Sequence, residues 1–326
     1  MLLIKNRCLN PHFNLALDEY LLTARNDEFF TLWQNSPSVI IGRNQDALAE
    51  IDFDFLRQNN IALVRRMSGG GAVFHDLGNI NFTYITRCEK TDFFNFARFA
   101  APILSALKAL GVEAQASGRN DLTIDDKKFS GNAQHLSGGR LLHHGTLLFD
   151  SDFGYMQGAL RVDPEKLKGK GVASVKSRVT NIRGHLARDM DTSAFLDFVE
   201  EHILGFFPEI RPYELSESNL EQVKRLEMEK YRTDGWNFLH MGSYAFKNSA
   251  RFPFGRVEVR FDVSGGVICG AGFSGDFFGP TDIGGLEEGL RGVPHTFDAV
   301  LEAFERLKIE DYISGAEKEQ IATLFF

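Results

Sequence analysis

Apolar and polar positions in the first third of the chain repeat with two different periods, which predicts both helices and strands. Asn10 and Pro11 supply an N-cap and a first-turn proline, and the apolar residues after them recur at helical spacing, so a helix is expected there. The runs at 29–34 and 38–44 are separated by turn residues and predict a β-hairpin. The run at 61–66 predicts a buried strand that ends at consecutive glycines.

Further strand and helix signals follow in the middle of the chain. Residues 80–86 have the pattern of a strand. A helical pattern from about residue 94 to residue 110 ends at Gly111, which suits a C′ position. Two more amphipathic helices are expected near 193–206 and 219–231.

Three closely spaced strands are predicted between residues 121 and 150. The strands at 121–125 and 128–134 are joined by a turn at Asp125 and Asp126, and a turn at 137–139 leads into the strand at 140–150. Such short connections join antiparallel neighbours, so we expect a largely antiparallel or mixed sheet rather than the parallel sheet of a βαβ fold. The fold class is therefore α+β.

The periodicity lapses between residues 242 and 253, which indicates a domain boundary near residue 246. A new unit follows with two strands and two helices, at 255–263, 267–274, 283–290 and 296–307. A chain of 326 residues exceeds what one core usually holds. We therefore expect a large domain at 1–245, which would hold the catalytic site, and a small α+β domain at 246–326.

Charge and length argue against several classes of protein. The chain has 36 basic and 44 acidic residues, a net charge of −8, which argues against a sequence-independent nucleic-acid binder. Charge appears within the first residues and no apolar run approaches the length of a membrane span, so we expect a cytoplasmic protein without a membrane partner. Cys8, Cys88 and Cys269 are scattered and lack CxxC spacing, so unpaired thiols are expected.

A basic segment between Arg161 and Arg188 stands out on this acidic chain. Against Asp163 and Glu165 it carries eight basic residues: Arg161, Lys166, Lys168, Lys170, Lys176, Arg178, Arg183 and Arg188. Two interpretations stay open: a solvated loop, or a surface that meets an anionic ligand or an acidic partner.

The segment RRMSGGGAVFHDLGN, residues 65–79, joins two arginines to three consecutive glycines. Glycine backbone N–H groups can approach phosphate oxygens closely. No Gly-Lys-Ser/Thr follows, and the next residues have a strand pattern, so neither a P-loop nor a dinucleotide fingerprint is present. The glycines alone also fit a tight connection between strands, but the guanidinium groups of Arg65 and Arg66 favour an anion site.

A second segment with candidate chemistry is KKFSGNAQ, residues 127–134. In a regular strand the side chains of Lys127 and Lys128 point to opposite faces, so one of them faces the sheet interior or a cleft. The same alternation groups Lys128 with Ser130 and Asn132.

His143 and His144 raise the question of a metal site in the strand at 140–150. Adjacent residues of a strand point to opposite faces, so the two imidazoles cannot easily bind one ion. We interpret them as part of a packed strand with one polar side chain directed inward. Metal ligands are left unassigned.

Three blocks, RRMSGGGAVFHDLGNINFTY, ASGRNDLTID with KKFSGNAQ, and LLHHGTLLFD, together resemble the signature blocks of lipoate-protein ligases. The resemblance extends over nearly the whole chain, including a small C-terminal domain. It implies a mixed-sheet catalytic domain of the type shared with biotin-protein ligases. It also implies an enzyme that activates lipoate with ATP and Mg²⁺ to lipoyl-AMP, releasing pyrophosphate, and then transfers the lipoyl group to a lysine.

The acceptor lysine lies, by the same resemblance, on lipoyl carrier domains: the E2 subunits of 2-oxoacid dehydrogenases or the glycine-cleavage H protein. We expect a monomer. The resemblance does not indicate which carrier is modified or whether octanoate is accepted.

The resemblance implies roles for individual residues. Lys128, in the K-x-S-G-x-A pattern, would hold the lipoate carboxylate and the α-phosphate together. Lipoate contacts are implied for Trp33, Gly42, Arg43, Arg66, Ser68, Gly69, Gly70, Gly71, His75, Lys128, His144 and Gly145. ATP or adenylate contacts are implied for Arg66, Gly71, Ala72, Val73, Phe74, His75, Asn79, Lys128, Ser130 and Ala133. Asp121 is the candidate for steering the incoming lysine amine.

Two details of the chain qualify these roles. Some relatives carry a third arginine where this chain has Met67, so any phosphate contact made there is not carried over. The stretch KGKGVASVKSRVTN, within the basic segment, resembles the family's loop that closes near the adenylate. Its charge is also a candidate for steering an acidic carrier domain.

Three alternatives differ in chemistry. An octanoyl or lipoyl transferase of the same fold works through an acyl-cysteine, but this chain has no cysteine between Cys88 and Cys269. Biotin ligases carry arginines interleaved with the glycines, which SGGGAVFHD does not show. A non-catalytic lipoate-binding or nucleotide-binding protein would keep the pocket but would not turn over ATP.

Overall fold

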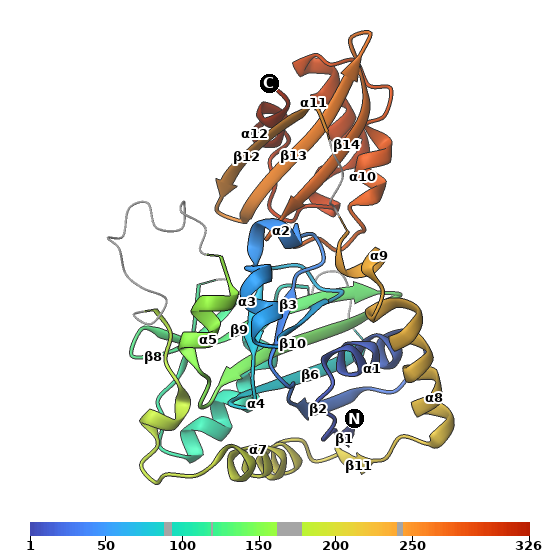
Figure 1. The fold of residues 1–326 in the computed structure, drawn as a ribbon. Helices are drawn as coiled ribbons and strands as arrows, with labels where there is room; N and C mark the ends of the chain where they lie inside the picture. The colour runs from blue at the N-terminus through green and yellow to red at the C-terminus, as the bar shows by residue number, and fades with distance from the viewer. Residues whose placement is uncertain (88–92, 119, 162–177, 240–243) are drawn as a thin grey trace. The chain divides into compact units, whose positions relative to one another are not determined.

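The computed structural model describes residues 1–87, 93–118, 120–161, 178–239 and 244–326 (Figure 1). Two compact units divide the chain. Unit 1 comprises Met1–Ile40, Asp52–Val64 and Val73–Thr233, and unit 2 comprises Ile41–Ile51, Arg65–Ala72 and Asp234–Phe326. Two short segments from the first quarter of the chain, one of them containing the three glycines, therefore belong to the same unit as the C-terminal residues.

An eight-stranded mixed sheet forms the centre of unit 1 (Figure 1). Its strand order is β11 (Arg211–Tyr213), β1 (Leu2–Lys5), β2 (Phe29–Trp33), β6 (Asn79–Arg87), β10 (Arg140–Leu148), β9 (Lys127–Ser137), β8 (Asp121–Ile124) and β7 (Gln115–Ser117). β1 runs parallel to both of its neighbours, and the other pairs are antiparallel. The predicted mixed sheet and α+β class are confirmed.

Tight turns join β8, β9 and β10, as the sequence predicts. Asp125 and Asp126 both have positive φ, 48° and 60°, and so do Gly138 and Gly139, at 56° and 73°. Two consecutive residues with positive φ are typical of type I′ hairpin turns, whose twist matches that of the strands. In the resulting register Lys128 pairs with Thr123 of β8.

The predicted hairpin between 29–34 and 38–44 is wrong. β2 pairs with β1 and β6, whereas a separate three-stranded sheet contains β4 (Ala62–Arg65), β3 (Ser38–Ile41) and β5 (Val73–His75). The connection after β2 is anchored at Asn35, whereas Ser36 and Pro37 are exposed: Asn35 is fully buried, its Oδ1 accepts a hydrogen bond from Asn14 and its Nδ2 contacts Nδ1 of His75.

Helices cover both faces of the large sheet. α4 (Phe96–Ala109) and α7 (Thr192–Phe206) contribute to a core of aromatic and aliphatic side chains on one face. α1 (Pro11–Thr23) contributes Asp18 to the polar groups of the other face. The predicted cap of α1 is confirmed, because Asn10 Oδ1 accepts the N–H of His12 at 3.0 Å. Gly111 has φ +78° after α4, as its predicted C′ position requires.

Shorter helices complete unit 1. They are α3 (Phe53–Gln58), α5 (Phe153–Ala159), η3 (Ile182–His185) and α8 (Glu217–Leu226), which continues into a π-helical turn, η4 (Glu227–Tyr231). α8 with η4 covers the whole of the helix predicted at 219–231.

Unit 2 contains a three-stranded antiparallel sheet and several helices, of which those within residues 284–325 share a hydrophobic core with the sheet (Figure 1). The strands are β12 (Phe246–Phe252), β13 (Gly255–Ser264) and β14 (Val267–Gly275), and the helices are α2 (Ala47–Glu50), α9 (Asp234–Asn237), α10 (Gly284–Gly289), α11 (Phe297–Leu307), η5 (Ile309–Asp311), α12 (Lys318–Ala322) and η6 (Thr323–Phe325). The two strands and two helices predicted after the boundary are present.

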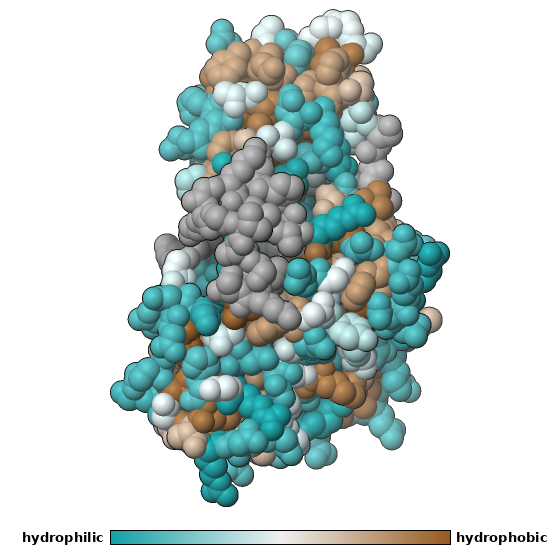
Figure 2. Space-filling model, turned by 60° about the vertical axis from the view of Figure 1, so that its left-hand side comes forward, coloured by the Kyte–Doolittle hydropathy of each residue, from teal (hydrophilic) through white to brown (hydrophobic). Residues whose placement is uncertain are grey.

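Polar residues cover most of the surface visible in Figure 2, with smaller hydrophobic patches between them. Among the described residues, no helix combines the length and the apolar character that crossing a membrane requires. Cys8 and Cys269 are free thiols, as predicted, and Cys88 lies outside the described residues.

Candidate active site

An ion pair joins the two predicted catalytic side chains in unit 1. Lys128 Nζ lies 2.7 Å from Asp121 Oδ1, and the two side chains are 40% and 38% exposed. The residues belong to the paired strands β9 and β8. On the edge of β9 that faces away from β8, the backbone carbonyl of Lys128 accepts a hydrogen bond from the N–H of Thr180 at 2.9 Å.

The predicted grouping of Lys128 with Ser130 and Asn132 on one strand face is wrong. β9 carries a bulge against β8 between Lys128 and Ser130, and a bulge changes which face the neighbouring side chains occupy. A Cβ atom added to Gly131 would lie 3.0 Å from Lys128 Nζ, so Lys128 lies on the face of Gly131. Asn132 Nδ2 donates to Ser130 Oγ at 3.3 Å on the opposite face.

A row of paired residues crosses the sheet from this ion pair. Asp121 pairs with Gly131, whose N–H donates to Oγ1 of Thr146 at 3.1 Å. Thr146 pairs with Asn81, and Asn81 pairs with Trp33 on β2. Residues that pair directly share a face of the sheet, so Trp33 lies on the same face as the ion pair.

The neighbouring row contains His144. His144 pairs with Ala133 on one side and with Thr83 on the other. Its Nδ1 lies 3.1 Å from Oδ2 of Asp18, on helix α1. Trp33, Ala133, His144 and Lys128, which the sequence analysis assigned to the substrates, therefore lie on one face of one sheet.

His143 points to the opposite face, as strand alternation predicts. Its imidazole stacks on Phe99 with ring centroids 4.8 Å apart, and its Nδ1 contacts Gln134 Nε2 at 3.1 Å. Burial lowers the pKa of His143 well below its ordinary value, and the nearby charge of His144 lowers it further. Gly145 also faces this side, because a Cβ there would meet the Phe82 ring at 2.5 Å.

Arg66 organises the glycine loop in unit 2. Its Nη2 donates to the carbonyls of Gly69 and Gly71 at 2.7 and 2.8 Å, and its Nε donates to Ser68 Oγ at 3.0 Å. Arg66 is 6% exposed. Burial, with a contribution from the charge of Arg65, lowers the pKa of Arg66 to about 9, so the guanidinium stays charged at neutral pH.

The three glycines serve different purposes. A Cβ on Gly69 would meet the carbonyl oxygen of Phe277 at 2.5 Å, and Gly70 has φ +91° with the Phe278 ring 3.0 Å from its Cβ position. Close packing therefore requires glycine at both positions. A Cβ on Gly71 would meet no atom within 4 Å, so this glycine faces open space.

Arg65 has a structural role that the sequence analysis missed. Its guanidinium donates to six backbone carbonyls within unit 2, those of Gly42, Arg43, Gln45, Trp236, Asn237 and Leu239. Arg65 is fully buried, and burial lowers its pKa to about 10. These bonds explain why 41–51 and 65–72 belong to the same unit as residues after 234.

The remaining predicted site residues adjoin the glycine loop in sequence. Val73, Phe74 and His75 form β5 in unit 1, and His75 is 3% exposed. Asn79, at the start of β6, is fully buried, and its Nδ2 donates to Asn81 Oδ1 at 2.9 Å.

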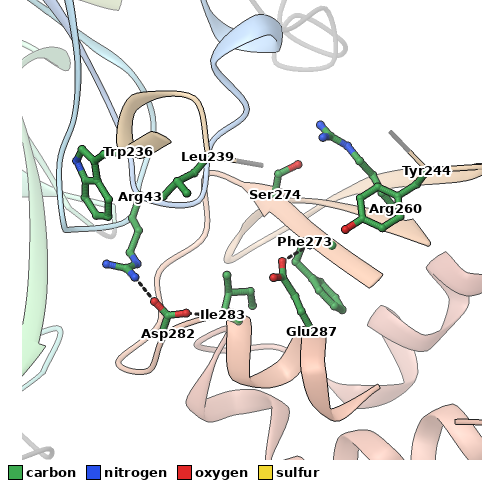
Figure 3. Close-up of a pocket in the computed structure, with 12 residues that line it drawn as sticks. Arg43, Trp236, Leu239, Tyr244, Arg260, Phe273, Ser274, Asp282, Ile283 and Glu287 are labelled. Carbon is green, nitrogen blue, oxygen red and sulfur yellow. Dashed lines mark hydrogen bonds and ion pairs between the residues drawn. The ribbon is translucent and has the colours of Figure 1, made fainter. Parts of the chain in front are cut away.

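Arg43 lines a cavity of about 510 Å³ within unit 2 (Figure 3). Its guanidinium bonds to the carboxylate of Asp282 and lies 5.5 Å from the ring centroid of Trp236. Glu287 also lines this cavity, and its Oε1 accepts the N–H of Phe273 at 2.8 Å. Burial, with the charge of Asp282, raises the pKa of Glu287.

Within the described ranges, no group of three His, Cys, Asp or Glu side chains could hold a metal ion. Mg²⁺ in nucleotide-dependent enzymes is bound largely through phosphates and waters, with one or two carboxylates. A dedicated protein cage is therefore not required, and we assign no Mg²⁺ ligands.

Asp18, Thr83 and Asn81 are residues of this face that the sequence analysis did not select. One signal was available for Asp18: in the sequence it directly follows the apolar run Leu15-Ala16-Leu17 of a predicted helix, and a carboxylate that is buried in such a run needs a partner. Thr83 and Asn81 gave no such signal, because a polar residue in a strand usually faces solvent.

Comparison with known proteins identifies the family. Residues 10–204 match the lipoyl protein ligase A/B catalytic domain, and residues 242–325 match the bacterial lipoate protein ligase C-terminus. The chain is 37% identical to lipoate-protein ligase LplJ of Bacillus subtilis, with 100% of each chain covered. It is 38% identical to lipoate-protein ligase 1 of Staphylococcus aureus, with 98% of each covered.

Solved structures agree on the fold. P. falciparum LipL1 in complex with lipoate has a TM-score of 0.79 at 24% identity and covers 95% of this chain and 98% of its own. Lipoate-protein ligase A bound with ATP has a TM-score of 0.62 at 25% identity, covering 73% and 97%. The matched models, the full-length relatives and the fold together show that this chain belongs to the lipoate-protein ligase family.

Proposed function

We propose that this enzyme condenses lipoate with ATP to lipoyl-AMP, releasing pyrophosphate, and then transfers the lipoyl group to the ε-amine of a lysine on a lipoyl carrier domain. The family membership supports the overall reaction. A bipartite relative from Thermoplasma acidophilum, 27% identical over 74% of this chain, is described together with its E2 lipoyl domain, which supports a carrier of this class. The E2 subunits of 2-oxoacid dehydrogenases and the glycine-cleavage H protein are the proposed acceptors.

The Lys128–Asp121 ion pair is the observation that carries the proposal. In the first half-reaction a carboxylate attacks the α-phosphorus, and negative charge accumulates between two anions. The Lys128 ammonium offsets that charge and holds the two groups together, which is electrostatic and positional catalysis. The lysine is partly exposed and its described ion-pair partner is a single carboxylate, so an incoming anion can compete for it.

The acyl chain is proposed to cross the sheet from Lys128 toward Trp33. Neighbouring strands lie about 4.8 Å apart, so β9, which carries Lys128, and β2, which carries Trp33, are three spacings or about 14 Å apart at the backbone. Trp33 and His144 lie on the required face. Burial of the chain would contribute about 0.8 kcal/mol per methylene.

The glycine loop is proposed to bind lipoate and the nucleotide phosphates. Gly71 is open to close approach, and Arg66 holds the carbonyls of Gly69 and Gly71, which leaves the loop's shape fixed before a ligand arrives. Substrate contacts that the resemblance implies stay predictions for the remaining residues: Gly42, Arg43, Ser68, Gly70, Ala72, Val73, Phe74, His75, Asn79, Ser130, Ala133 and Gly145.

Asp121 is proposed to receive the acceptor lysine in the second half-reaction. An unperturbed lysine has a pKa of about 10.4, so about one amine in a thousand is neutral near pH 7.4. A carboxylate beside the acyl site orients the ammonium and accepts its proton. Asp121 also lines a hollow of about 220 Å³ within unit 1, together with Asn132 and residues at the start of α4.

Several finer points stay predictions. Mg²⁺ is proposed as the cation that accompanies ATP, the protein is proposed to be a monomer, and a cytoplasmic location is expected. The basic segment falls largely outside the described residues, at 162–177. If it steers an acidic carrier, the association rate with a lipoyl domain will fall steeply with salt, whereas a flat salt response would contradict steering.

Lipoate-dependent exchange of labelled pyrophosphate into ATP tests the first half-reaction. We expect exchange with lipoate in the wild type and a loss of about 10²-fold to 10³-fold in Lys128→Ala. Lys127→Ala is the matched control, because Lys127 is exposed next to Lys128 and should leave exchange unchanged. Octanoate and biotin serve as comparison acids. No exchange with any acid would instead favour a transferase or a non-catalytic binding protein.

A further inference from the structure

One carboxylate connects two residues of the proposed acyl site. Asp18 Oδ2 lies 3.1 Å from His144 Nδ1 and accepts a hydrogen bond from Thr83 Oγ1 at 3.3 Å. Thr83 Oγ1 in turn accepts the N–H of Trp33 at 2.9 Å. Asp18, Thr83 and Trp33 are at most 3% exposed, and His144 is 8% exposed.

The direction of each hydrogen bond follows from the chemistry of the groups. An ionised carboxylate only accepts, so His144 Nδ1 must carry the hydrogen that faces Asp18. The indole N–H of Trp33 only donates, so Thr83 accepts from Trp33 and uses its own hydrogen for Asp18. Asp18 thereby fixes the imidazole directly and the indole through one hydroxyl.

Packing of α1 does not account for this arrangement. The helix already buries apolar side chains such as Phe13, Leu17 and Leu21. Burying a carboxylate is costly unless it is fully paired, and an apolar residue of similar volume would pack the helix at lower cost. A buried carboxylate that touches two site residues is therefore better explained by what it does to those residues.

We propose that Asp18 is a positioning residue for acyl recognition: it holds the His144 imidazole and, through Thr83, the Trp33 indole in the orientations that the lipoate chain requires. This inference rests on the proposed function, which assigns Trp33 and His144 to the lipoyl pocket. Asp18 itself touches neither substrate. Asp18 therefore affects the binding of lipoate and not the binding of ATP.

Asp18→Asn tests the inference. The amide has nearly the same shape but carries no negative charge. Both hydrogen bonds, from His144 and from Thr83, end on Oδ2, so they become weaker neutral bonds if the amide oxygen takes that position, and both are lost if the NH₂ group takes it. We expect KM for lipoate in the exchange assay to rise about ten- to a hundredfold, with KM for ATP unchanged. Calorimetric titration with lipoate should show a rise of the same size in the Kd for lipoate.

A second variant keeps the test independent of folding. Thr83→Val removes only the link between Asp18 and Trp33 at nearly constant volume, and we expect a smaller rise in KM for lipoate. Because both changes act on one network, the double variant should lose less than the product of the two single effects. Glu19→Gln is the control on the same helix: Glu19 Oε2 accepts from Lys230 and Tyr231, each at 2.6 Å, and its loss should leave both KM values unchanged.

The outcomes separate this inference from the proposed function. If the wild type shows no lipoate-dependent exchange, the proposed function fails. If the wild type is active but Asp18→Asn raises both KM values equally, or lowers thermal stability without changing KM for lipoate, Asp18 is only structural and the inference is overturned.

Discussion

The side chains of Lys128 and Ser130 lie on opposite faces of the central sheet, although two positions separate them along β9. The bulge between them reverses the expected alternation and directs Lys128 toward Asp121, over Gly131. Bulges are common next to active sites, where they redirect a side chain. The local backbone geometry therefore selects the lysine's face of the sheet.

Gly131→Ala should impair adenylation without unfolding the protein. The added Cβ would lie 3.0 Å from Lys128 Nζ and 3.1 Å from its Cε, so the end of the lysine side chain must shift by a few tenths of an ångström. We expect pyrophosphate exchange to fall about tenfold or more, because small displacements of a catalytic group are costly. Gly205→Ala is the control, since a Cβ there meets no atom within 4 Å. Unchanged exchange in Gly131→Ala would show that the lysine position is not critical.

Asp121→Asn should slow lipoyl transfer while leaving adenylate formation intact. The amide keeps the shape of Asp121 but cannot take a proton from the acceptor amine, and loss of a general base typically costs about 10²-fold to 10⁴-fold. Single-turnover transfer from preformed lipoyl-AMP to a lipoyl domain measures the second step, and pyrophosphate exchange measures the first. Equal losses in both steps would refute the assigned role.

Arg65→Lys should destabilise unit 2 strongly. Lysine has three donors on one nitrogen and cannot reach the six carbonyls that the guanidinium binds, so buried acceptors lose their partners. We expect the free energy of unfolding to fall by about 3–5 kcal/mol. Urea denaturation followed by circular dichroism measures the change. Arg57→Lys is the control, because the side chain of Arg57 is 80% exposed and should have no measurable effect.

His143 should make the protein less stable at acidic pH. Burial lowers its pKa well below the ordinary value of about 6.5, so below that pH the unfolded chain binds a proton that the folded protein does not. The stabilising contribution is complete above about pH 6.5 and is lost progressively as the pH falls toward the folded-state pKa.

His143→Leu should reduce the slope of unfolding free energy against pH below 6.5 by up to about 1.4 kcal/mol per pH unit. Denaturant titrations at a series of pH values from 7.5 to about 4.5 measure this slope. The variant will also be less stable at every pH, because Gln134 Nε2 loses its hydrogen-bond partner. The test is therefore the slope of the unfolding free energy against pH and not its absolute value. The same slope in both proteins would mean that His143 does not contribute.

The family and its signature residues were available in the sequence because they are local patterns. The glycine segment, the K-x-S-G-x-A pattern and the His-His-Gly strand are short stretches, and their order along the chain is specific. The type I′ turns at Asp125–Asp126 and Gly138–Gly139 were likewise predictable, since turn chemistry depends on the residues of the turn itself.

Non-local contacts decided the rest. The bulge in β9 depends on its pairing with β8, and the role of Arg65 depends on carbonyls up to 174 positions away. The separation of β2 from β3 depends on partners in two different sheets. Asp18 comes near His144 and Thr83 only because α1 lies against the sheet face. Sequence alone thus determined the chemistry and the fold class, which local patterns encode, whereas tertiary structure decided which side chains meet, because that depends on residues far apart in the chain.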